Sequence, residues 1–87
     1  MNWRQIIDKY YSDNAELKDI LLRHSSAVAR KALDIAERHP ELNLDLNFIE
    51  EAAMLHDIGV IKTDAPDIKC YGHEPYIRHG VLGAEML

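Results

Sequence analysis

One long helical pattern limits the fold of this 87-residue chain more than any other feature. It begins near Ala15 and ends near His39, because Pro40 cannot continue a helix. The segment RKALDIAER within it consists of strong helix formers. Ser25 and Ser26 compete for backbone hydrogen bonds, so we expect a bend there if the helix has one. One stripe along the helix is expected to be its inward face, and it is formed by Ile20, Leu21, His24, Val28, Ala32 and Ile35.

Three shorter segments also carry helical patterns. They are an amphipathic stretch over residues 3–11, the segment FIEEAAMLHD at 48–57, and the C-terminal segment PYIRHGVLGAEML at 75–87. The intervening segment VIKTDAPDIKCYGHEP is predicted to be a long loop, which in a small domain is often functional. No segment alternates as a strand does, so we predict an all-α fold with residues 1–87 in one domain.

Three glycines are predicted to have structural roles. Gly59 directly follows the third helix, where a residue with positive φ commonly ends a helix. Gly80 and Gly83 fall on one face of the last helix and would let another backbone approach closely.

Composition excludes several classes of protein. The net charge is −5, which argues against binding of duplex nucleic acid, although a bound metal can reverse the local sign for a small anionic substrate. Cys70 is the single cysteine, so no internal disulfide can form. The sequence has neither a signal-peptide pattern nor about 20 consecutive apolar residues. We therefore expect a cytoplasmic protein without a membrane span.

Histidines on apolar helix faces are the residues that could carry chemistry. His24, His56 and His79 each occupy such a face in a different helix, and Asp57 adjoins His56. Imidazole and carboxylate are suitable ligands for Fe, Mn, Co, Ni or Zn. A negative charge at a helix C-terminus opposes the helix dipole, and a cation beside Asp57 would resolve that conflict. The alternative for each histidine is a buried ring satisfied by a backbone carbonyl.

The segment MLHDIG at 54–59 resembles the hallmark of the HD superfamily of metal-dependent phosphohydrolases, in its HDIG-type branch. The upstream segment LLRHSSAVARKALDIA is similar to the family helix that begins with an inward-facing histidine, which assigns that role to His24. The downstream segment GHEPYIRHGVLGAEML resembles a region that supplies a further histidine, here His79, with His73 as a weaker candidate. The resemblance covers about residues 21–87 and implies an HD-domain-like helical bundle.

The resemblance also implies an activity. The protein would hydrolyse a phosphate ester, such as a nucleotide or a related metabolite, by attack of a metal-bound water. His24, His56 and Asp57 would hold one divalent transition metal ion, and Asp57 would bridge to a second ion held partly by His79. His56 and Asp57 would be the catalytic pair.

Contacts to the substrate phosphate are predicted less directly. Many HDIG proteins have a lysine where this chain has Val60, so Lys62 is a candidate, as are Lys69 and Arg78 as the nearest other basic residues. The rival hypothesis is a non-catalytic helical signalling or interaction module with a degenerate or structural metal site.

Members of the family continue beyond the region that this chain covers, and they supply a distal aspartate as a further ligand. We therefore expect the bundle to be incomplete at its C-terminus. Asp64 and Asp67 precede His79 and are predicted to shape turns instead. Apolar faces left uncovered would favour association into homo-oligomers.

Overall fold

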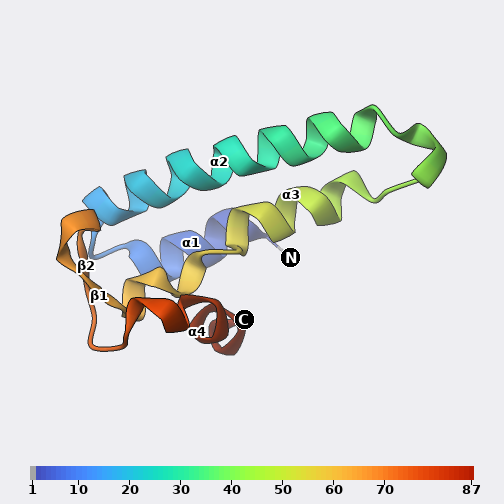
Figure 1. The fold of residues 1–87 in the computed structure, drawn as a ribbon. Helices are drawn as coiled ribbons and strands as arrows, with labels where there is room; N and C mark the ends of the chain where they lie inside the picture. The colour runs from blue at the N-terminus through green and yellow to red at the C-terminus, as the bar shows by residue number, and fades with distance from the viewer. Residues whose placement is uncertain (1) are drawn as a thin grey trace.

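The structure is a computed structural model, and it describes residues 2–87. Its four α-helices are α1 (Trp3–Tyr11), α2 (Ala15–Glu37), α3 (Leu46–Leu55) and α4 (His79–Met86) (Figure 1). Four short 3-10 helices connect them, η1 (Pro40–Leu42), η2 (Ile58–Lys62), η3 (Pro66–Ile68) and η4 (Tyr76–Arg78). The all-α prediction is therefore confirmed.

Side-chain caps explain where three of the helices begin. Asn2, Asn14 and Asp45 precede α1, α2 and α3, and each side-chain oxygen accepts a hydrogen bond from a backbone N–H three residues further on. Such caps satisfy donors that have no partner inside the helix. The helix α2 then runs unbroken through Ser25 and Ser26, the position at which the sequence allows a bend (Figure 1).

The buried face of α2 differs from the predicted stripe. Leu21 of that stripe is buried, but Ile20 and Ile35 are 38% and 49% exposed. The other buried residues of α2 lie outside the stripe, and they are Leu17, Ser25, Ala29 and Ala36. The helices α2 and α3 lie side by side as an antiparallel hairpin, and Ala29 of α2 and Ala53 of α3 belong to the same buried cluster (Figure 1). The large apolar residues suggested a stripe that is rotated from the true interface, because this part of the interface uses small residues.

The predicted loop after α3 contains a small sheet. The strands β1 (Asp64–Ala65) and β2 (Cys70–Tyr71) pair antiparallel, with Asp64 opposite Tyr71 and Ala65 opposite Cys70. Lys69 has a φ of 65° in the turn between them. Two-residue strands are too short to produce an alternating pattern, which is why the sequence did not reveal them.

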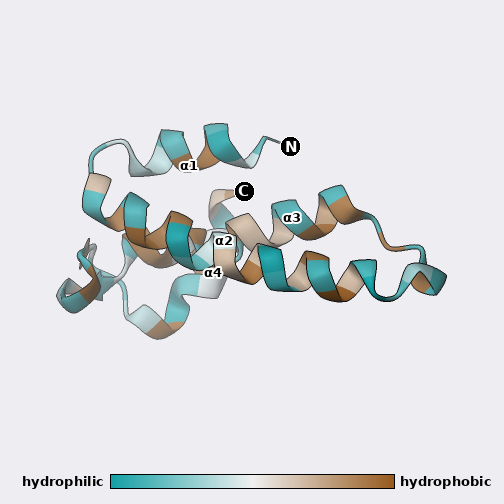
Figure 2. Cartoon of the chain, turned by 90° about the horizontal axis from the view of Figure 1, so that it is seen from above, coloured by the Kyte–Doolittle hydropathy of each residue, from teal (hydrophilic) through white to brown (hydrophobic). Residues whose placement is uncertain are grey.

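The main hydrophobic core lies at one end of the hairpin. It joins α1, the first turns of α2 and the segment after α3, through Ile7, Tyr11, Leu17, Leu21, Leu55, Ile58, Val60 and Cys70. The Tyr11 hydroxyl donates a buried hydrogen bond of 2.6 Å to the carbonyl of Ile58. Residues 37–48, at the opposite end, are all exposed, and the molecule measures 44 × 22 × 22 Å. Figure 2 shows the α2–α3 hairpin extending beyond α1 and α4 at this end.

Gly59 has a different role from the one predicted. No described glycine has a positive φ. A Cβ atom at Gly59 would instead lie 2.0 Å from the His79 carbonyl oxygen and 2.3 Å from the Gly83 backbone nitrogen. Gly83 makes the reciprocal close approach, as predicted, whereas a Cβ atom at Gly80 would meet nothing within 4 Å, so that prediction is wrong. Gly59 is thus required for α4 to pack directly on η2.

Candidate metal centre

Asp57 lies at the junction between α3 and η2. The helix α3 ends at Leu55, His56 is its C-cap, and Asp57 connects it to the 3-10 turn that begins at Ile58. The hydrogen bond from Tyr11 to the Ile58 carbonyl holds this junction against the core. The backbone around Asp57 is therefore fixed from both sides, by α3 before it and by the core after it.

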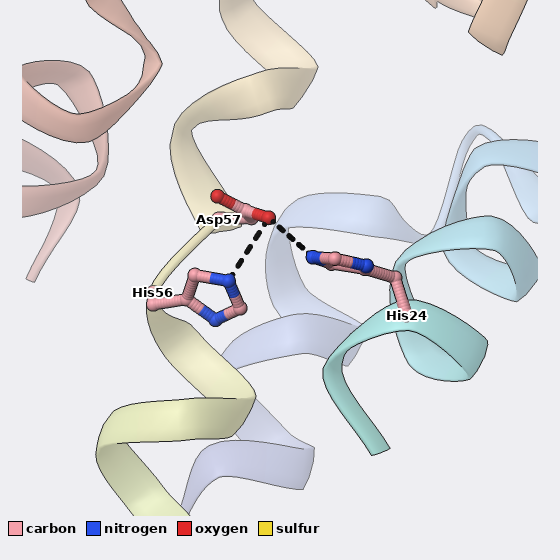
Figure 3. A group of neighbouring side chains, drawn as sticks. All are labelled: His24, His56 and Asp57. Atoms are coloured by element: carbon pink, nitrogen blue, oxygen red, sulfur yellow. Dashed lines mark ion pairs between the residues drawn. The ribbon is translucent and has the colours of Figure 1, made fainter. Parts of the chain in front are cut away.

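Three imidazole rings surround the Asp57 carboxylate. The Nε2 atoms of His24 and His56 lie 3.0 and 3.1 Å from Oδ2 (Figure 3). The Nε2 atom of His79 lies 3.2 Å from the other oxygen, Oδ1. The close packing of α4 on η2 at Gly59 brings His79 to this position. The structure thus brings together all four residues predicted as metal ligands.

Hydrogen bonds to backbone carbonyls determine which nitrogen of a histidine ring carries the proton. The Nδ1 atoms of His56 and His79 lie 2.5 and 2.8 Å from the carbonyl oxygens of Ala53 and Tyr76. Each Nδ1 therefore carries a proton that it donates, and the Nε2 of a neutral ring presents a lone pair. A lone pair aimed at a carboxylate oxygen is repelled unless a cation, either a proton or a metal ion, lies between them.

This donor set suits a divalent metal ion. Ligand atoms of His24, His56 and Asp57 all lie within 4.8 Å of one another. Histidines that bind metals characteristically donate their second nitrogen to a carbonyl or carboxylate, as His56 does here. The side chains of His24 and His56 are half exposed, so solvent can reach the position between them. Three protein ligands with open positions are typical of a catalytic rather than a structural metal site.

Asp57 offers its two oxygens to different groups of histidines. Oδ2 faces His24 and His56, and Oδ1 faces His79. A carboxylate in this arrangement can bridge two ions. His79 is also positioned by the Tyr76 ring, whose centroid lies 4.7 Å from its own.

The other candidates lie outside this cluster. His73 is exposed between β2 and η4, and Lys62 is exposed at the end of η2. The Arg78 guanidinium lies 2.9 Å from the Glu74 carboxylate, and the Lys69 ammonium lies 3.7 Å from Glu16. Arg78 and Lys69 therefore already face carboxylates. Asp67 lies in η3, the turn between the two strands, in agreement with its predicted role, whereas Asp64 lies in β1 opposite Tyr71, so its predicted role in a turn is wrong.

Sequence reasoning missed Tyr11 and Tyr76. The sequence places Tyr11 only at the end of the amphipathic stretch 3–11, but the residue is fully buried, and burial raises the pKa of its hydroxyl well above the usual value. It therefore remains a hydrogen-bond donor at neutral pH. The only available signal was its place at the end of an amphipathic helix, which does not indicate a contact 47 positions away. Burial also raises the pKa of the Cys70 thiol, which agrees with a packing role.

The fold and this cluster together define an all-α protein with a histidine–aspartate centre of the kind that holds divalent metal ions. The HD domain family model matches residues 21–87, which is most of the chain. The chain therefore belongs to the HD domain family, whose members form a superfamily of metal-dependent phosphohydrolases. Searches among curated proteins and among solved structures returned no match. In the described part of the chain, no helix is both long and apolar enough to span a bilayer.

Proposed function

We propose that this domain is a metal-dependent phosphohydrolase that cleaves a phosphate ester, such as a nucleotide or a related phosphorylated metabolite. The observation that carries the proposal is the convergence of three Nε2 atoms on the two oxygens of Asp57, with the Nδ1 protons of His56 and His79 committed to backbone carbonyls. Membership of the HD family supports the same reaction class.

In this proposal each residue has a defined task. His24, His56 and Oδ2 of Asp57 hold one divalent ion, and Oδ1 with His79 contributes to a second. Such ions polarise a phosphoryl group and acidify a water molecule for attack on phosphorus. Asp57 sets the spacing between the two ion positions, because its Oδ2 faces His24 and its Oδ1 faces His79.

The surroundings of the site favour a substrate that approaches from solvent. His24 and His56 are half exposed, while Asp57 is only 22% exposed beneath them. The carboxylate thus lies at the base of the cluster and the two rings form its open side. An anionic substrate would meet the ions there, in a chain whose net charge is otherwise −5.

A metal titration tests the proposal. Isothermal titration of the apo-protein with Mn²⁺ or Zn²⁺ is compared between the wild type, His56→Ala and Asp57→Asn. Both variants remove a direct ligand, so affinity should fall by more than the ~10–100-fold that loss of an outer partner costs. His39→Ala is the matched control, because His39 is an exposed histidine at the other end of α2 whose ring pairs with Glu41.

Hydrolysis of a panel of phosphate esters is then measured with the metal-loaded wild type and the same variants. Loss of hydrolysis in His56→Ala with retention in His39→Ala supports the proposal. If the protein binds no transition metal and His56→Ala leaves hydrolysis unchanged, the proposal fails. Metal binding without turnover of any ester would favour the non-catalytic module instead.

A further inference from the structure

A small apolar groove adjoins the metal centre. It has a volume of about 140 Å³ and lies between α2, η2, η3 and η4. Two of its lining residues, His24 and Asp57, belong to the metal centre. The remaining lining residues are Leu17, Ile20, Leu21, Val60, Ile68 and Tyr76. The groove is therefore continuous with the position where a phosphoryl group would bind.

The groove has a rigid base and an open rim. Leu17, Leu21 and Val60 form the base, and all three belong to the main hydrophobic core. Ile20 and Tyr76 form the rim and are 38% and 46% exposed. Because the base is already packed, these two partly exposed side chains form an apolar surface, and such a surface favours contact with an apolar group over contact with water.

Cationic side chains do not line the groove. The nearby basic residues on α2 face carboxylates, since Lys18 pairs with Asp8 and Arg23 lies 3.1 Å from Asp19. Beyond the groove, Lys69 faces Glu16 in the same way. A chain of further phosphates would find no counter-charge in the lining, and sugar hydroxyls would find no hydrogen-bonding side chain there apart from His24, Asp57 and the exposed Tyr76.

From these observations we infer that the preferred substrate is a phosphate monoester whose ester oxygen carries a single ring-sized apolar group, and that Ile20 and Tyr76 select it. This inference rests on the proposed function of the adjoining site. In the reaction, water forms the new P–O bond, the bond from phosphorus to the ester oxygen breaks, and that oxygen takes a proton and leaves as the ring alcohol or phenol. The products are this hydroxyl compound and inorganic phosphate.

The volume of the groove matches a group of one ring. An engineered apolar cavity of about 150 Å³ binds one benzene molecule. A groove of about 140 Å³ therefore has room for one six-membered ring. Tyr76 contributes both to this rim and to the ring contact with His79, so a bound ring would lie against a residue that also positions the metal centre.

The test compares two inert phosphonates with the same anionic head, phenylphosphonate and methylphosphonate, by calorimetric titration of the Zn²⁺-loaded protein. Binding avoids the difference in leaving-group chemistry that would confuse a comparison of rates. Phenylphosphonate should bind about tenfold more tightly, which corresponds to about 1.4 kcal/mol of apolar burial. Methyl resonances in the NMR spectrum should shift at Ile20 and remain unchanged at Ile35.

Substitutions on one helix supply the matched control. Ile20→Ser should lose about threefold in affinity for phenylphosphonate and leave that for methylphosphonate unchanged. Ile35→Ser removes an isoleucine of α2 that is also partly exposed, at 49% against 38% for Ile20, and lies far from the groove, so it should change neither affinity. Equal affinity of the two phosphonates, or equal losses in both variants, overturns the inference but leaves the proposed function intact if phosphate esters are still hydrolysed. Failure to bind either phosphonate or to hydrolyse any ester overturns both.

Discussion

The two ends of the α2–α3 hairpin are built from the same pair of helices but differ in almost every other respect. At the site end, which comprises α1, α2 up to Ser25 and residues 55–87, the hairpin packs against the main core and carries the candidate metal centre. At the distal end, residues 37–48, every residue is exposed, including Leu42, Leu44 and Phe48. Contacts between distant parts of the sequence, rather than helix propensity, distinguish the two ends.

This difference indicates where substitutions should matter. The site end positions its ligands through close backbone approach at Gly59 and a buried hydrogen bond from Tyr11. The distal end consists of exposed side chains around one turn, and Phe48 alone among them also lines the groove between α3 and α4. We therefore expect stability and metal affinity to change together at the site end and to remain constant at the distal end.

The largest effect is expected from Gly59→Ala. Its new Cβ would lie 2.0 Å from a backbone oxygen and 2.3 Å from a backbone nitrogen of α4, so the helix has to move and take His79 away from Asp57. Unfolding free energy should fall by about 3 kcal/mol or more, and the melting temperature by more than about 10 °C. Thermal denaturation and metal titration measure the two consequences.

Gly80→Ala is the control for that substitution. It adds the same methyl group to α4 where nothing lies within 4 Å, and alanine favours a helix over glycine by about 0.5 kcal/mol. The melting temperature should therefore stay the same or rise slightly. If both substitutions destabilised the protein equally, the close contact between Gly59 and α4 would not explain the effect of Gly59→Ala.

Tyr11→Phe should have the next largest effect. It leaves the buried Ile58 carbonyl without its hydrogen bond, at a cost of about 1–3 kcal/mol in unfolding free energy. Because that carbonyl directly follows Asp57, metal affinity should also fall, by about tenfold. Chemical denaturation and calorimetry measure both, and Tyr71→Phe, at a tyrosine 65% exposed, should change neither. Loss of stability without loss of affinity would refute the positioning role.

Alkaline pH should separate the wild type from Tyr11→Phe. Burial raises the pKa of Tyr11 in the folded protein, so between the unfolded value of about 10 and the folded value the native state binds the extra proton. This contribution to stability is complete below pH 10 and decreases as the pH rises, by up to about 1.4 kcal/mol per pH unit. Denaturant titrations from pH 9 to 11.5 should show that the unfolding free energy declines more steeply for the wild type than for Tyr11→Phe. Parallel declines would contradict this role of the Tyr11 proton.

The smallest effect on stability is expected at the distal end. Phe48 is 65% exposed and lines an open groove of about 320 Å³ between α3 and α4, so Phe48→Ser should change unfolding free energy by less than about 0.5 kcal/mol. The same exposed surface should promote self-association of the wild type, which light scattering would detect as a mass that rises with concentration. Phe48→Ser should reduce that rise; a monomeric wild type at high concentration would contradict the expectation.

The helices, and the set of residues that meet at Asp57, could be predicted because their signals are local. Periodicity located all four α-helices, and HDIG-like residues at 54–59 with two flanking histidines identified the residues that meet at Asp57. The buried face of α2 could not be predicted from its large residues, because Ser25 and Ala29 face inward while Ile20 and Ile35 remain half exposed.

Long-range contacts account for the remaining differences. The sequence predicts a positive φ at Gly59, but the glycine is required there by the backbone of α4, which begins 20 positions further along the sequence. The hydrogen bond of Tyr11 to Ile58 and the groove beside His24 likewise arise only when separate elements meet. Patterns within one segment carry no information on such partners.

The exposed turn at Pro40–Leu42 has a consequence for how the site can vary. His24 and Asp57 face each other across an antiparallel pair of helices. The chain between them therefore runs along α2 to the distal end and comes back along α3. Removing one helical turn from each helix, or inserting a folded domain at the turn, would leave the ligand positions unchanged. The 32 positions that separate His24 from His56 are thus a variable spacer, open to fusion and to divergence without redesign of the chemistry.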